Sequence, residues 1–389
     1  MKIQSDYLWQ GASKMEKVAN LLKKQITSTI IAILCGFIVV AVLLAFTGYH
    51  PLEAFGILFQ GIFSKPKYIS QVIIKATPII LTGISVAFAF KVGLFNIGAE
   101  GQYIMGSIVA TITGILFDLP PFLQIPVVVI SGVCAGGIFG AIVGYLKAKF
   151  GIHEVITSIM LNWIAFYFGN FIVNTQRFHQ PNSTGTYMIN ESGFTMFLYE
   201  WKNSEAGKAF LMKHPVLLDV ILKTDINFGI IIAIIIAIII GILLKKTTKG
   251  YELRSVGFNK DAAEFAGIDV KKNIIHAMVI AGAISGLAGA LTITGMAPHK
   301  ISTMGTFENY GFNGLSVALI AGSSPVGCIF AGLLFAGLLY GGGSLQSTIG
   351  VPSEIINIMI GTIVFFVALT KVVPVLADKL IKRGERHAK

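Results

Sequence analysis

The chain has 389 residues, of which 54% are hydrophobic and 13% are charged, and its mean hydropathy is +0.77. Soluble domains carry about 25% charged residues, so this composition excludes an ordinary soluble protein and indicates a polytopic membrane protein. The formal net charge of +11 at pH 7 would also suit a nucleic-acid-binding protein, and the placement of the basic residues decides between the two.

Apolar runs long enough to cross a bilayer recur along the whole chain. A span needs roughly 20 apolar residues, and a helix is the expected span because it satisfies its own backbone in lipid. The sequence therefore predicts an all-α polytopic fold with about ten transmembrane helices. No Pro-rich or Ser-rich linker divides the chain, so residues 1–389 are expected to form a single transmembrane domain. The expected spans are 26–47, 69–90, 98–117, 123–146, 154–174, 227–244, 274–296, 310–323, 326–343 and 354–375.

The loops between these spans differ in their basic content. If both termini are cytoplasmic, the inner segments hold 20 of the 30 Lys and Arg residues, the outer segments hold 8, and Lys75 and Lys371 lie within spans. The positive-inside rule therefore predicts a multi-pass protein of the plasma membrane with both termini, including the tail 1–25, in the cytoplasm. The same asymmetry explains the net charge, so no nucleic-acid partner is expected.

The stretch KVGLFNIGAEGQ, residues 91–102, places polar side chains and glycines between two apolar spans. Polar groups at membrane depth are costly unless they are satisfied, so they tend to line cavities or to pair with each other. We expect a helix break here, with Asn96, Glu100 and Gln102 facing a polar path. The alternative is that Lys91 pairs with Glu100, while Asn96 and Gln102 satisfy backbone groups that the break leaves free.

Two of the expected spans carry glycines at helical spacing. Small residues let helix backbones approach closely in lipid, so we expect both rows to be packing ridges. They are Gly132, Gly136, Gly140 and Gly144 in one span, and Gly282, Gly286 and Gly289 in the other.

Two long segments lie outside the spans. Residues 175–226, extracellular in this topology, carry five basic and five acidic residues together with apolar patches, which indicates a structured cap or an interfacial helix. In the cytoplasmic segment 245–273, the piece NKDAAEFAGID predicts a short helix with Asn259 as its N-cap and Gly267 as its C-cap. Its small apolar surface suits a partner's groove, and the alternative is a helical reversal that lies on the membrane. The residues of this candidate docking helix are Asn259, Asp261, Ala262, Ala263, Glu264, Phe265, Ala266 and Gly267.

Motifs for covalent chemistry are absent from the sequence. There is no G-x-x-x-x-G-K-[ST] phosphate-binding loop and no H-E-x-x-H motif, and the seven histidines are scattered singly. We therefore expect no catalytic residue, no metal site and no cofactor on this chain. A pump built from it needs a partner that binds the nucleotide.

Three stretches carry a resemblance to a known family. They are GYELRSVGFNKDAAEFAGIDV (250–270) with AGAISGLAGAL (281–291), GLFNIGAEGQ (93–102), and GFNGLSVALIAGSSPVG (311–327). Together they resemble the permease subunits of bacterial ABC importers, in the branch that serves sugars, branched-chain amino acids and nucleosides. NIGAEGQ, with ITSIMLNWIA (156–165) and the long external segment, is most similar to the longer permease of nucleoside importers.

The resemblance implies a set of partners. The segment around Gly267 would be the coupling helix that docks on a cytoplasmic ABC ATPase, and that subunit would bind ATP-Mg. A second homologous permease, forming a heterodimer, and an extracellular substrate-binding lipoprotein complete the implied importer in the bacterial cytoplasmic membrane. The implied function is nucleoside import by alternating access.

Two alternatives to nucleoside import stay open at this point. One is a simple-sugar or branched-chain amino acid permease of the same class. The other is a proton-coupled secondary transporter, with Glu100 as the proton carrier. A lipid-embedded enzyme is disfavoured because catalytic motifs are absent.

A nucleoside offers a flat base and a hydroxyl-rich sugar, which suit aromatic stacking and amide hydrogen bonds. Trp163 lies near the middle of its expected span and, seven residues from Asn170, shares a helix face with it. The predicted substrate-binding residues are Phe95, Asn96, Glu100, Gln102, Asn162, Trp163, Phe166 and, from the opposite half of the chain, Asn313.

Overall fold

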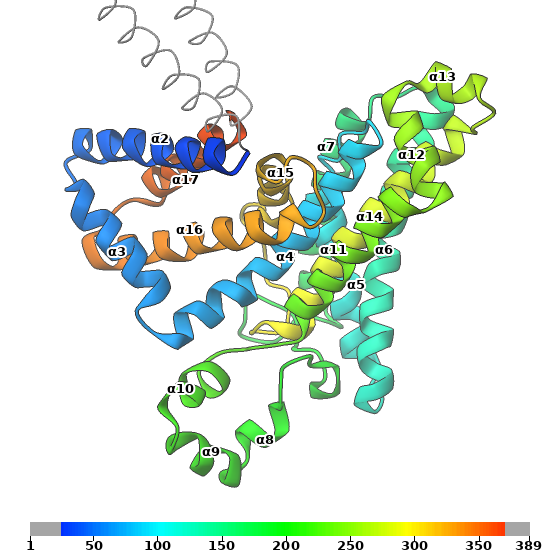
Figure 1. Ribbon diagram of the computed structural model, residues 1–389. Coiled ribbons are helices and arrows are strands. Elements are labelled where there is room, and N and C mark those ends of the chain that lie inside the picture. The colour runs from blue at the N-terminus through cyan, green and yellow to red at the C-terminus, as the bar shows by residue number, and fades with distance from the viewer. Residues whose placement is uncertain (1–24, 370–389) are drawn as a thin grey trace, which may run out of the picture. The chain divides into compact units, whose positions relative to one another are not determined.

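The computed structural model describes residues 25–369, in which helices account for nearly all of the regular structure (Figure 1). A helix coincides with each expected span, so the predicted all-α membrane fold is confirmed. The predicted tail 1–25 lies almost entirely outside the described residues, as does the end of the last span, 354–375. The ten helices are α2 (Gln25–Phe46), α4 (Pro66–Lys91), α5 (Ala99–Leu116), α6 (Pro121–Phe150), α7 (Glu154–Asn174), α11 (Gly229–Lys246), α14 (Val270–Gly295), α15 (Tyr310–Ile320), α16 (Gly327–Ile349) and α17 (Ser353–Ala368).

These helices differ in length and in hydropathy. Within the described residues, six are long and apolar enough to cross a membrane by themselves: α4, α6, α7, α11, α14 and α16. The helices α15 and α17 are shorter, and α2 joins a helix that the sequence did not predict, α3 (Pro51–Phe63), at an angle of 119°. Helix α5 has the same 18 residues as α11 but falls below it in hydropathy, and α15, with 11 residues, is a half-length helix.

The chain divides into two compact units. Among the described residues, the smaller unit comprises those up to Gly61 together with those from Gly341 onward, and in it α17 packs against α2. Aromatic rings join α2 to α3, since the Phe37 ring lies 5.3 Å from that of Phe55. The larger unit, Ile62–Tyr340, contains every residue singled out above as a candidate for binding or docking.

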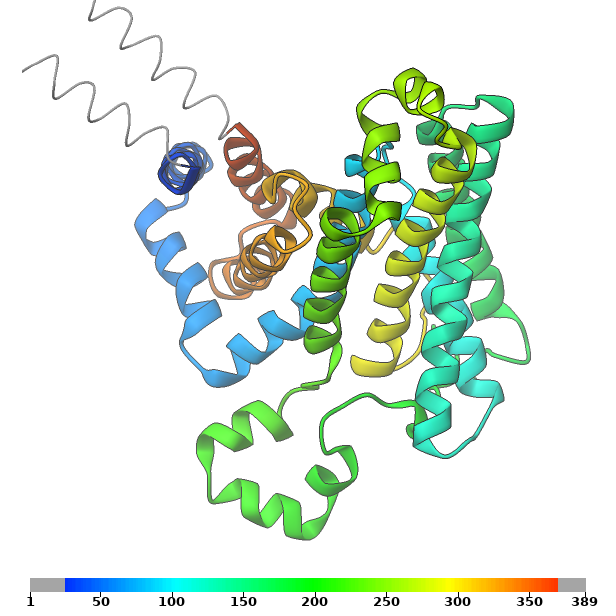
Figure 2. The same cartoon turned by 45° about the vertical axis from the view of Figure 1, so that its right-hand side comes forward.

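Helix α14 is the central element of the larger unit, and it packs against α4, α5 and α6. Figure 2 shows α14 running alongside α6. The two rows of glycines lie at these contacts: a Cβ on Gly136 would lie 2.6 Å from the Cα of Gly286, and Gly289 packs against Tyr103 and Ser107 of α5. The predicted packing ridges are confirmed.

Gly136 offers a direct test of this packing. In Gly136→Ala the new methyl would overlap the backbone of Gly286, whereas in the adjacent Gly137→Ala it would lie 3.7 Å from the Ala283 methyl. Overpacking of this kind costs about 1–3 kcal/mol. We expect the Tm of the detergent-solubilised protein to fall by several degrees in Gly136→Ala and to stay unchanged in Gly137→Ala. Equal Tm values for the two variants would contradict the close approach of α6 and α14.

The segment 175–226 is structured, as predicted. It contains the helices α8 (Tyr199–Asn203), α9 (Glu205–Met212) and α10 (Pro215–Leu217) and the short turns η1 (Glu191–Gly193) and η2 (Leu218–Leu222).

This segment is fixed to the loop after α14, because Thr186 donates its N–H to the carbonyl of Ile301 and Ile189 donates to that of His299. Burial lowers the pKa of the Lys202 ammonium, and the carboxylate of Asp225 opposes this shift. The side of the membrane on which segment 175–226 lies stays a prediction.

Candidate functional site

The predicted break between α4 and α5 is present at residues 92–98. Helix α4 ends at Lys91, and the next turn places Gly93 in the left-handed region with φ of 71°. A glycine is favoured there both by this φ and by space, since a Cβ on Gly93 would lie 3.0 Å from the backbone of Gly257 in α12 (Thr248–Phe258). The break thus places the segment after α4 against the segment after α11.

The amides of the break are buried and satisfied within the chain. Asn96 and Gln102 donate to each other's carbonyl oxygens at 2.9 and 3.1 Å, and Asn96 also donates to the hydroxyl of Ser85 in α4. Asn162 of α7 accepts the N–H of Gly101 at 2.8 Å and donates to the carbonyl of Ile97. Each of these three predicted binding residues therefore holds the shape of the break in this conformation, and their contact with substrate stays a prediction.

Glu100 lies in the first turn of α5, fully buried, and its carboxylate faces the first turn of α15. It accepts the backbone N–H groups of Asn309 at 2.8 Å, Gly311 at 2.6 Å and Phe312 at 3.4 Å. The first N–H groups of a helix have no partner within the helix and carry a partial positive charge. Glu100 of α5 therefore caps the N-terminus of α15, and this half-length helix starts at the residues that donate to the Glu100 carboxyl group.

The alternative pairing of Lys91 with Glu100 is wrong. Lys91 is exposed at the end of α4, and within the described residues no ion pair joins it to Glu100. The carboxyl group of Glu100 instead accepts three backbone N–H groups.

The predicted aromatic residues are divided between the interior and the surface. Phe166 is buried, Phe95 is half-buried with its ring 5.1 Å from that of Phe90, and Asn313 is half-buried in α15. Trp163 is 44% exposed, and its ring lies 4.8 Å from that of Phe307. Among the predicted residues, Trp163 is therefore the one whose ring is most open to a ligand.

Sequence reasoning missed the residues that lie beside Trp163. Residues 302–309, which we call the polar strip, form a non-helical stretch between α14 and α15, and all but Met304 and Phe307 are exposed. The amide of Asn170, in the last turns of α7, exchanges two hydrogen bonds with the backbone of Met304. Because Phe307 then meets Trp163 near the middle of α7, the polar strip runs from the end of that helix to its middle.

A non-helical, exposed backbone at membrane depth is tolerated only where it is covered by protein or lines a water-filled cavity. The polar strip carries hydroxyls, an amide and the carboxylate of Glu308, which accepts the phenol O–H of the buried Tyr103 at 2.8 Å. The sequence signal that could have found it is the shortness of the span that follows, because a half-length helix requires its preceding loop to enter the membrane. Trp163 and the polar strip together form the candidate site.

The segment after α11 folds as two short helices, α12 and α13 (Lys260–Phe265). The side chain of Asn259 accepts the N–H of Ala262 at 3.0 Å, so the predicted N-cap is confirmed. The C-cap is Ala266, one position before the predicted Gly267, and Gly267 follows it in the left-handed region with φ of 81°.

The predicted apolar surface of α13 is only partly available. Ala263 is buried within the loop, while Ala262 and Ala266 are exposed beside Asp261 and Glu264. The largest exposed apolar groups are Phe258 and Phe265, each 96% exposed. Two phenylalanines this exposed on one small helical corner indicate a surface that a partner covers.

Comparison with known proteins identifies a family and several relatives of this chain. The family described as "Branched-chain amino acid transport system / permease component" matches residues 68–369. The guanosine ABC transporter permease protein NupP of Bacillus subtilis is 38% identical over 91% of this chain and 96% of its own length. The nucleoside ABC transporter permease protein NupB of Lactococcus lactis is 36% identical over 95% of this chain and 98% of its own length. A second nucleoside permease protein of that bacterium, NupC, is 26% identical over 68% of this chain and 78% of its own length. No solved structure matches the chain.

The family match covers most of the chain, and the relatives align over nearly their whole length. It agrees with the apolar helices of the structure, which indicate a multi-pass membrane protein. The chain therefore belongs to the family of permease components of the branched-chain amino acid transport type.

Proposed function

We propose that this chain is the membrane-spanning permease subunit of an ABC importer that carries nucleosides across the cytoplasmic membrane. The observation that carries the proposal is the similarity to NupP and NupB, which are named as guanosine and nucleoside permeases and align over almost their entire length. The resemblance of NIGAEGQ and ITSIMLNWIA to nucleoside permeases agrees with these names.

The substrate path in this proposal runs along the polar strip. A base would stack on Trp163 or Phe307, and the ribose hydroxyls would bond to side chains such as Glu308. The buried amides of Asn96 and Gln102 would not contact the nucleoside. Their mutual hydrogen bonds would fix the break between α4 and α5 and thereby the position of the first turn of α5.

The ATPase partner would act on this chain at the corner between α12 and α13. A cytoplasmic ABC ATPase that binds ATP-Mg would cover Phe258 and Phe265, together with the predicted docking residues from Asn259 to Gly267. Closure of the ATPases would move this corner, and the contact of Gly257 with Gly93 would transmit the movement to the break between α4 and α5. The chain itself carries out no covalent chemistry in this scheme.

Three further parts of the proposal concern assembly and orientation. Both termini lie in the cytoplasm and segment 175–226 faces outward, because the basic residues concentrate on the side of α12 and α13. The second permease is a different, homologous chain, and the occurrence of both NupB and NupC in Lactococcus lactis supports this. An extracellular substrate-binding lipoprotein delivers the nucleoside to the outer face.

Competitive uptake tests the substrate class. Cells that lack other nucleoside carriers and express the complete transporter are given labelled guanosine, with unlabelled nucleosides, ribose, glucose or leucine in large excess. We expect guanosine and other nucleosides to suppress uptake of the label almost completely, and sugars and leucine to leave it unchanged. Suppression by ribose or by leucine would instead support one of the two rival substrates.

A further inference from the structure

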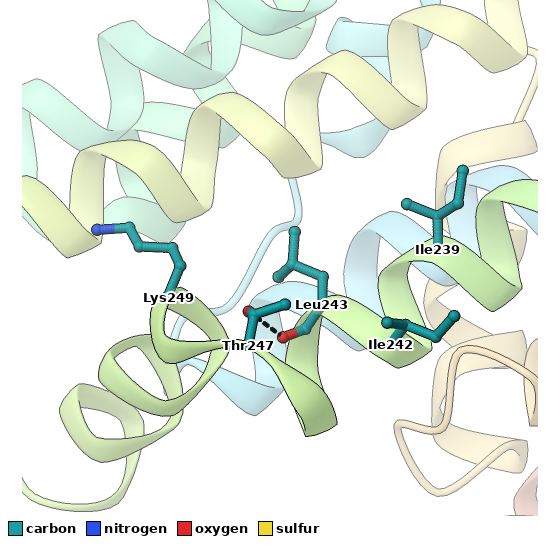
Figure 3. A pocket seen from close by; sticks show the side chains of 5 residues that line it. All are labelled: Ile239, Ile242, Leu243, Thr247 and Lys249. Atoms are coloured by element: carbon teal, nitrogen blue, oxygen red, sulfur yellow. Dashed lines mark hydrogen bonds between the residues drawn. The ribbon is translucent and has the colours of Figure 1, made fainter.

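A groove lies at the C-terminal end of α11, where this helix meets α12 (Figure 3). Its volume is about 410 Å³. It is apolar along α11 and basic at the corner that leads into α12. The residues that line it are Ile239, Ile242, Leu243, Thr247 and Lys249.

The α11 side of the groove continues into a wide apolar face. Between Gly229 and Leu244 this helix contains only glycine, alanine, isoleucine and leucine. Several of its isoleucines are about half exposed, which means that nothing in the described chain covers them. A face without a single polar side chain is suited to hydrocarbon and unsuited to an aqueous path. The exposed isoleucines are Ile231, Ile234, Ile235, Ile238, Ile239 and Ile242.

The other side of the groove is basic. Lys245 and Lys246 follow the last leucine of α11 and are exposed, and Lys249 is half-buried one turn further on. Lys249 pairs with Glu252 at 3.0 Å, and its ammonium group also acts on the carboxylate of Asp269, which pairs with Lys272 at 3.2 Å. Two acids therefore face four ammonium groups at this corner, those of Lys245, Lys246, Lys249 and Lys272. The hydroxyl of Thr247 is already used, since it donates to the carbonyl of Leu243 and accepts the N–H of Gly250. The corner therefore keeps a net positive charge with exposed ammonium groups.

We propose that this groove binds an anionic phospholipid, with an acyl chain against Ile239, Ile242 and Leu243 and the phosphate at the lysines. Lys246 lies four residues beyond Ile242, which is about 6 Å along a helix and places the ammonium groups at headgroup level when the isoleucines contact hydrocarbon. Basic pockets at the ends of membrane helices attract anionic headgroups. The occupant is thus set by charge complementarity at one end of the groove and by hydrocarbon at the other.

The test uses the full chain with a single tryptophan as reporter at Ile242. Ile242→Trp is made in a background in which the native Trp9, Trp163 and Trp201 are phenylalanine. The protein is reconstituted into phosphatidylcholine vesicles that contain increasing fractions of brominated phosphatidylglycerol, and the quenching of the reporter gives a relative binding constant for the two lipids. We expect phosphatidylglycerol to be preferred about threefold or more.

Two controls separate a site from a general charge effect. The reporter Ile235→Trp lies seven residues away on the same face of α11 but far from the lysines, and we expect it to show no preference. In the Ile242→Trp background, Lys245→Gln with Lys246→Gln and Lys249→Gln should abolish the preference. The matched triple Lys208→Gln with Lys213→Gln and Lys223→Gln removes three exposed lysines of segment 175–226 and should preserve the preference.

Three outcomes would overturn the proposal. They are equal quenching by brominated phosphatidylcholine and phosphatidylglycerol, a preference that survives loss of the groove lysines, and absence of quenching by either lipid. The last outcome would show that protein, such as a second permease, covers the groove. If the tryptophan-free background fails to elute as a folded protein, the same comparison is made with Ile242→Trp in the natural sequence, read as the difference from the parent chain.

Discussion

ATP-driven uptake is expected to be lost when Phe258 and Phe265 are both replaced by serine. Each ring is almost fully exposed, so its removal costs the chain little packing, while a partner that buries it loses an aromatic anchor. Loss of such an anchor costs a complex about 2 kcal/mol, or about thirtyfold in affinity for each residue. Together the two replacements should leave the ATPase unbound and uptake of labelled nucleoside near background. The measurement is uptake in cells, combined with co-purification of the ATPase.

Conservative replacements separate docking from folding. Phe258→Leu with Phe265→Leu keeps an apolar anchor of similar size, and this variant should retain most of the uptake and of the bound ATPase. The serine variant should still accumulate in the membrane at the level of the parent. Nucleoside uptake that persists in the serine variant and stops on addition of a protonophore would contradict the ABC mechanism, and would favour the proton-coupled carrier.

The helices of this fold were predictable because the signals for them are local. Apolar runs give the spans, the glycine rows give the contacts of α6 and α14, and Asn259 gives the start of α13. Helix α3 was missed because it has only 13 residues and follows α2 closely. An apolar run of this length is too short to be recognised as a span from hydropathy, so the segment is interpreted as a loop. The half-length of α15 was visible as a short span, but its consequence for the preceding loop requires the three-dimensional arrangement.

The chemistry of the site was predictable in kind and less so in detail. The sequence indicated that Asn96, Glu100 and Gln102 are special, because polar groups at membrane depth must find partners. It could not identify the partners of Glu100, since Asn309 is 209 residues away and offers only a backbone N–H, which every residue except proline has. The polar strip was missed for a related reason, because a polar loop between two spans is normally placed outside the membrane.

Glu100 and the polar strip are connected through the start of α15. The strip ends at Asn309, whose N–H is held by the Glu100 carboxylate, and Glu308 next to it is held by Tyr103 of the same helix, α5. Two contacts from α5 thus fix the end of the polar strip that leads into α15. Movement of α5, which begins at the break beside α12, would therefore shift the surface on which we propose that the base stacks.

The largest effect on the fold is expected from Glu100→Ala. The replacement leaves the N–H groups of Asn309, Gly311 and Phe312 without their acceptor, and a buried donor left unsatisfied costs about 1–3 kcal/mol. Glu100→Gln should also lose stability, because glutamine keeps only one acceptor oxygen and its NH2 group would face a backbone donor in place of the other oxygen. The measurement is the fraction of protein that elutes as a folded species after extraction, together with its Tm.

Glu308→Gln is the matched control, since Glu308 is exposed and accepts one hydrogen bond, from Tyr103. This variant should fold normally. The comparison also decides between two roles for Glu100. A proton carrier that becomes glutamine loses uptake but keeps its fold, whereas a cap that becomes glutamine loses the fold, and uptake with it. A well-folded, inactive Glu100→Gln would therefore contradict the capping role and support proton coupling. A poorly folded one is expected, because three backbone donors of α15 depend on this carboxylate.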